Sequence, residues 1–122
     1  MIIHDKEIIQ IYNHAESEYP NECCGVLLGD KNTFSVCEVE AATNTDTDEK
    51  KNIHFTMSSL DIYRIEKEAE KRGLDVLGFY HSHADHPAVL SQEDRRYMIP
   101  GCLYVIASVI QGKCVDLKTY EG

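Results

Sequence analysis

The chain has 122 residues, which is enough for one hydrophobic core and too few for two, so a single domain spanning residues 1–122 is expected. Its 21 acidic and 12 basic side chains give a net charge of −9. This charge argues against nucleic acid as a partner, because nucleic-acid-binding proteins usually present a basic surface. No apolar run approaches the roughly 18 residues of a membrane span, so no membrane partner is expected either.

The cysteines and the first residues of the chain predict a reducing, cytoplasmic location. Five is an odd number of cysteines, and the adjacent Cys23 and Cys24 make a poor disulfide framework. Residues 1–7 lack the basic leader and long apolar core of a secretory signal. Adjacent cysteines point to opposite faces of a strand and do not readily chelate one ion, so we interpret Cys23 and Cys24 as buried small apolar residues.

The first half of the chain predicts a helix, a β-hairpin and a loop. Apolar residues recur at helical spacing over residues 5–19, with Asp5 as the expected N-cap, which indicates a core-facing helix. Residues 22–29 are apolar on both faces and predict a strand inside a sheet, whereas residues 33–40 alternate and predict a half-exposed strand. Residues 41–53 are polar without periodicity and indicate a mobile loop, either a plain connection or a flap beside a site.

The second half predicts the remaining helices and strands. Residues 58–72 indicate a helix capped by a hydroxyl and ended by Gly73, and residues 75–81 indicate a central apolar strand. A short helix from residue 91 to about 98 and two strands at 102–110 and 113–120 follow. This mixed order, with an early and a late hairpin, predicts an α/β fold with a mixed β-sheet sandwiched by helices.

His81 and His83 are candidate metal ligands. Residues two apart in an extended segment share one face, so both imidazoles can approach one ion at the usual Zn–N distance of about 2.0–2.1 Å. Asp94 supplies a third ligand, and three protein ligands plus water is the open coordination of a catalytic zinc. His86 is an alternative to Asp94, although its place beyond the strand end, before Pro87, argues mildly against it.

Simpler explanations also exist for Ser91, Asp94 and Glu22. Ser91 and Asp94 fit the pattern of a hydroxyl cap followed three residues later by an acid, so both could serve only to begin a helix. The two roles are compatible, since a short capped helix is a rigid way to hold a carboxylate. Glu22, at the start of an apolar strand, could be a solvated acid at a strand end.

The spacing of these residues resembles the JAMM motif of the MPN-type metalloproteases. His-Ser-His at 81–83 is followed after seven residues by Ser-x-x-Asp at 91–94, with Glu22 upstream. Further stretches that resemble the small stand-alone prokaryotic members are residues 21–29, 54–56 and 76–83. The resemblance implies the MPN/JAMM fold, of the cytidine-deaminase-like class. Ala84 and Leu90 stand where the family commonly has proline, next to the ligands but not among them.

The resemblance implies a role for each motif residue. His81, His83 and Asp94 match the ligands of Zn²⁺, Glu22 matches the general base, and Ser91 matches the hydroxyl that stabilises the oxyanion. The implied activity is hydrolysis of the bond after the C-terminal Gly-Gly of a ubiquitin-like or sulfur-carrier protein, releasing an amino acid such as cysteine. Two alternatives stay open: a catalytically inactive MPN-type scaffold, and a zinc amidohydrolase of small amino-acid conjugates. The oligomeric state, monomer or homodimer, stays open as well.

Overall fold

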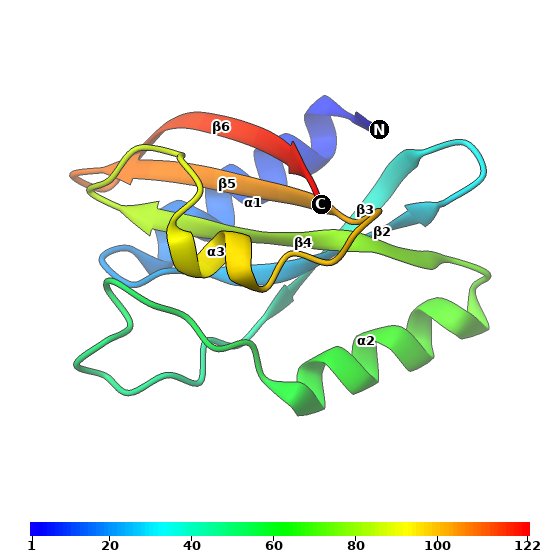
Figure 1. The fold of residues 1–122 in the computed structure, drawn as a ribbon, viewed down its shortest axis with the longest axis horizontal. Helices are drawn as coiled ribbons and strands as arrows, with labels where there is room; N and C mark the ends of the chain where they lie inside the picture. The colour runs from blue at the N-terminus through cyan, green and yellow to red at the C-terminus, as the bar shows by residue number, and fades with distance from the viewer.

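The computed structural model describes all residues from 1 to 122, and they form one six-stranded mixed sheet with three helices (Figure 1). The elements in chain order are β1 (Ile2–Ile3), α1 (Asp5–Glu18), β2 (Cys24–Asp30), β3 (Ser35–Ala42), α2 (Ser59–Lys71), β4 (Asp75–Ala84), α3 (Gln92–Arg96), β5 (Leu103–Ile110) and β6 (Lys113–Glu121). The predicted mixed sheet sandwiched by helices is therefore confirmed.

The strand order β1-β3-β2-β4-β5-β6 places β2 and β4 inside the sheet. Strand β2 runs antiparallel to both β3 and β4, while β4 and β5 are parallel. All of β2 except Asp30 is buried, as the apolar residues on both of its faces predicted. Because parallel neighbours need a crossover connection, the chain leaves the end of β4 and returns to the start of β5 through α3. This crossover brings Asp94 back towards the histidines of β4.

The two long helices cover opposite faces of the sheet. Ile11 of α1 packs with Leu27 of β2 in the larger core cluster, and Ile65 of α2 packs with Val26 and Leu28 in the smaller one. Since neighbouring residues of a strand face opposite sides, this alternation along β2 puts α1 behind the sheet in Figure 1 and α2 on the other side. Neither these helices nor α3 has the length and hydrophobicity needed to cross a membrane.

Some boundaries differ from those predicted. Asp5 was expected to cap α1, but His4 takes the N-cap position without a side-chain hydrogen bond, and Asp5 lies in the first turn. The reason is β1, which was not predicted: its two residues pair with β3 and keep the chain extended through His4. Strand β4 continues to Ala84, three residues beyond the predicted end, because its parallel pairing with β5 extends that far. Both His81 and His83 therefore lie within the strand.

Gly78 is the position in β4 where a side chain is least tolerable. A Cβ atom there would lie 1.7 Å from the carbonyl oxygen of Leu103 on β5. Gly78→Ala is thus expected to lower the free energy of unfolding by about 3 kcal/mol, at the upper end for overpacked sites. The matched variant Gly73→Ala, with a positive φ of 70° and open space around it, is expected to cost only about 1–2 kcal/mol. Urea unfolding of both variants measures the difference, and equal losses would contradict the crowding at Gly78.

Candidate metal centre and active site

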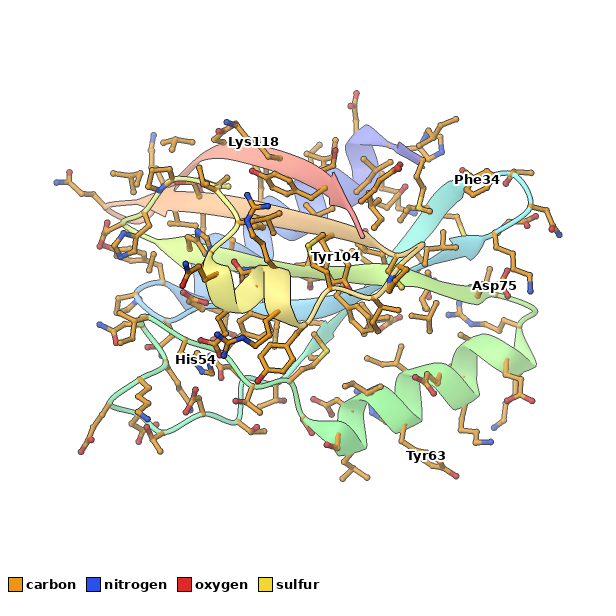
Figure 2. All side chains as sticks on the ribbon, in the orientation of Figure 1. Phe34, His54, Tyr63, Asp75, Tyr104 and Lys118 are labelled. Carbon is orange, nitrogen blue, oxygen red and sulfur yellow. The ribbon has the colours of Figure 1, made fainter.

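The motif residues line a cavity of about 710 Å³ between α3, the ends of β2 and β4, and the loop before α2. All five of them, Glu22, His81, His83, Ser91 and Asp94, lie in its wall. Apolar and aromatic side chains make up half of the lining, among them Phe55, Phe79, Leu90, Tyr97 and Tyr104. Figure 2 shows Tyr104 close to α3 and His54 on the loop beside that helix. The structure thus brings the five residues of the motif together in one cavity.

Pairing between β2 and β4 brings Glu22 to the histidines. The antiparallel register places Cys24 opposite His81. Cys23 and Ser82 continue this ladder, since the Ser82 amide donates to the Cys23 carbonyl over 3.1 Å and the Cys23 amide donates to the Ser82 hydroxyl over 2.8 Å. One further step along both chains puts Glu22 at the level of His83. The start of the hairpin therefore supplies Glu22, and the central strand β4 supplies the two histidines.

The three candidate ligand side chains, His81, His83 and Asp94, bring their polar atoms close together. His81 Nε2 lies 3.3 Å from His83 Nε2 and 3.3 Å from Asp94 Oδ1, and His83 Nε2 lies 3.4 Å from Asp94 Oδ2. Ligand atoms of a tetrahedral zinc with bonds of about 2.0–2.1 Å lie about 3.3 Å apart. The two Asp94 distances are to different oxygens of its carboxylate, and the three side chains lie close enough together to share one such ion.

Neighbouring groups fix the orientation of both histidines. His83 Nδ1 donates to the Pro87 carbonyl over 2.7 Å, which leaves the lone pair of His83 Nε2 facing the ligand cluster. The ring of Phe55 stacks on His81 with a centroid distance of 4.5 Å. The exposed fractions of the His81, His83 and Asp94 side chains are 7%, 12% and 13%, so the cluster is shielded but reachable from the cavity.

The electrostatics of the cluster also fit a cation. Burial lowers the pKa of His81, which favours the neutral imidazole that a metal requires. Burial opposes ionisation of Asp94, but the neighbouring imidazoles of His81 and His83 hold the pKa of this carboxyl well below its usual range. Burial also acts against a charge on His83, yet Asp94 and the Pro87 carbonyl raise its pKa. A negative site with two imidazoles and one carboxylate is a donor set that zinc accepts.

Ser91 and Asp94 cap α3 and also face the cavity. The Asp94 amide donates to Ser91 Oγ over 2.9 Å, and the Ser91 amide donates to Asp94 Oδ2 over 3.0 Å, which is a complete capping box. Because Ser91 Oγ accepts in this arrangement, its own hydroxyl hydrogen is available to a substrate. Capping of α3 and a place in the cavity are therefore compatible for Ser91 and Asp94.

Glu22 is not a solvated acid at a strand end. Only 6% of the residue is exposed, and it lies just before β2 in the wall of the cavity. Burial raises the pKa of Glu22 to about 7, against a smaller opposing effect of His83. A carboxyl group with this pKa can take up and release a proton near neutral pH.

His86 does not join the cluster, while three residues that were given no role lie beside the site. The metal-binding group consists of His81, His83 and Asp94 alone, and His86 only lines the cavity. No role was predicted for Asn44, His54 or Glu93. The Asn44 side chain donates to the Glu22 carbonyl, and His54 bonds Glu93, which directly precedes Asp94. The sequence signalled only His54, within the stretch 54–56 that resembles the family.

Residues 4–120 match the family described as prokaryotic homologs of the JAB domain. The chain belongs to this family. Desampylase from Haloferax volcanii is 33% identical to this JAB-domain protein over 95 residues, which are 77% of this chain and 67% of that protein. The solution structure of a Salinibacter ruber protein is 34% identical with a TM-score of 0.75, and the match covers 99% of this chain and 81% of that one.

A more distant structure shares the fold of this JAB-domain protein. It is described as JAMM, a metalloprotease-like zinc site in the proteasome and signalosome. It is 18% identical to this chain with a TM-score of 0.61, and the match covers 99% of this chain and 86% of that one. The predicted membership of the JAMM/MPN family and the predicted fold class are thereby confirmed.

Proposed function

We propose that this JAB-domain protein is a zinc-dependent isopeptidase that hydrolyses the bond after the C-terminal Gly-Gly of a ubiquitin-like or sulfur-carrier protein. The observation that carries the proposal is the convergence of His81 Nε2, His83 Nε2 and the Asp94 carboxylate at distances of 3.3–3.4 Å. The Haloferax relative supports the substrate class, since the name desampylase denotes removal of a ubiquitin-like modifier. A cytoplasmic location, in which all five cysteines stay free as they are here, belongs to the same proposal.

The residues around the ligands supply acid–base chemistry and hydrogen bonding. When bound, zinc lowers the pKa of a water to about 7 and polarises a carbonyl. Glu22, with its pKa near 7, accepts a proton from the attacking water and returns it to the leaving amine. The free hydrogen of the Ser91 hydroxyl donates to the oxygen on which negative charge develops. Burial of Glu22 keeps competing solvent away from this proton transfer.

The shape and lining of the cavity fit the tail of a protein. The cavity is open to the surface, with the large side chains of Ile53, Tyr97 and Ile99 exposed around it. Phe55 stacks directly on the ligand His81, so the residue next to the reacting bond must pass close to an aromatic ring. Glycine has no side chain to clash there, whereas apolar residues further along the tail can contact the rest of the lining.

The proposal is tested with one carrier protein presented in three forms. The purified zinc-loaded protein is incubated with a carrier that ends in Gly-Gly linked to a lysine side chain, with the same carrier extended by one cysteine, and with free dipeptides. Mass spectrometry is expected to show cleavage after the second glycine in the first two substrates and none in the third. Turnover of dipeptides alone would favour the small-molecule amidohydrolase. No turnover of any substrate, together with a failure of the protein to take up zinc, would favour the inactive scaffold.

A further inference from the structure

Residues 43–57, between β3 and α2, connect Glu22 with helix α3, which carries Asp94. We call these residues the 43–57 segment. Its far end, residues 53–57, lines the cavity, and only Ile53 of these belongs to the stretch 41–53 that was predicted as a plain connection or a flap. Residues 41 and 42 belong to β3 instead. The segment touches Glu22 at one end and α3 at the other, and each contact is made by a polar side chain.

Asn44 ties the segment to the backbone of Glu22. Its Nδ2 donates to the Glu22 carbonyl over 3.0 Å and to the His54 carbonyl over 3.1 Å. Its Oδ1 accepts from the amides of Asp46 and Thr56. The side-chain amide therefore uses two donors and two acceptors, its full capacity. The Glu22 amide donates in turn to the Lys51 carbonyl over 2.6 Å, so this segment holds both the backbone N–H and the backbone carbonyl of Glu22.

His54 ties the same segment to α3. Its Nδ1 bonds Asp46 within the segment, and its Nε2 bonds Glu93 on α3. Both partners are carboxyl groups, whose oxygens can accept hydrogen bonds from ring N–H groups. The hydrogen bonds to Glu93 and Asp46 accordingly raise the pKa of His54. Figure 2 shows His54 in this place beside the helix.

Helix α3 depends on such contacts for its position. It has five residues and buries none of them in the core, so apolar packing does not hold it. Asp94 is the neighbour of Glu93 on this helix, and a shift or tilt of α3 would move the carboxylate away from His81 and His83. Geometric errors of about 1 Å in a catalytic arrangement can cost about 100-fold in rate.

We propose that the 43–57 segment is a brace between Glu22 and helix α3, with Asn44 and His54 as positioning residues. Asn44 sets the position of Glu22, and the bond from His54 to Glu93 sets the position of α3 and therefore of Asp94. This inference rests on the proposed function, because it assigns Glu22 and Asp94 to one reaction. Neither Asn44 nor His54 needs to contact the substrate for this role.

The test compares His54→Ala, Glu93→Ala and the double variant with wild type. Loss of groups that orient metal ligands typically costs about 10–100-fold, so each single variant is expected to lower kcat by about that factor while KM changes less than about threefold. The double variant is expected to be no worse than either single one, because both remove the same bond. Glu93→Gln, which keeps an acceptor for His54, is expected to restore most of the rate. The control is His4→Ala, an exposed histidine away from the cavity whose side chain hydrogen-bonds Ser35.

Two measurements without substrate separate the brace from the proposed function. Hydrogen exchange of the amides at residues 92–96 is expected to accelerate in His54→Ala and Glu93→Ala but not in α2. Zinc affinity in a metal titration is expected to fall by about 10–100-fold. If His54→Ala fails to fold, Glu93→Ala on the exposed helix removes the same bond. Unchanged exchange together with unchanged zinc affinity would overturn the brace, whether or not the wild-type protein cleaves the carrier.

Discussion

Glu22→Gln is expected to keep about one zinc per chain and to lower the rate of carrier cleavage by about 10²–10⁴-fold, the usual contribution of a general acid–base group. The amide has the shape of the carboxyl group, so the neighbouring backbone and the cavity are preserved. It cannot accept a proton from water or return one to the leaving amine. Glu22 is not among the three residues whose atoms converge as metal ligands, which is why the metal is expected to stay. Metal analysis and a cleavage assay on the same preparation measure both effects.

The matched control for this variant is Glu66→Gln, a glutamate on the exposed side of α2 that is absent from the walls of the cavity. It makes the same chemical change away from the site and should leave zinc content and rate at wild-type values. Cleavage by Glu22→Gln at the wild-type rate would show that the proposed mechanism is wrong. Loss of zinc in Glu22→Gln would instead make Glu22 part of the metal site.

The shared face of His81 and His83 and the cap of α3 could be predicted from the sequence because their information is local. His81 and His83 share a face through the period of two along a strand, and this holds wherever the strand lies in the sheet. The capping pattern of Ser91 and Asp94 is equally local, and the structure contains it in full. For the same reason the long amphipathic helices and the interior strand β2 could be predicted from their residues.

The rest of the site depends on contacts between distant parts of the chain. Glu22 reaches His83 only through the register of β2 against β4, which no pattern within residues 22–29 reveals. Asn44 and His54 lie in a polar stretch without periodicity, and their partners are 22 and 39 residues away. The strand β1 escaped prediction because two residues cannot show a period. The wrong N-cap at Asp5 followed from that omission, since β1 holds the chain extended through His4.

Removing one ligand is expected to abolish the site. His83→Ala should weaken zinc binding by more than about 100-fold, since even the loss of a group that only orients a ligand costs about 10–100-fold. Cleavage should be lost with the metal. The fold should persist, because His83 lies in the wall of the cavity and is not part of either core cluster. Circular dichroism establishes the fold, and titration of the metal-free protein with zinc gives the affinity.

His86→Ala is the sharpest control for this variant, because it removes the same side chain three residues further along the chain. Both histidines line the cavity, but only His83 has a ring nitrogen close to the other candidate ligands. His86→Ala is therefore expected to bind zinc as tightly as wild type. Loss of zinc in His86→Ala with retention in His83→Ala would replace the ligand set by one that includes His86.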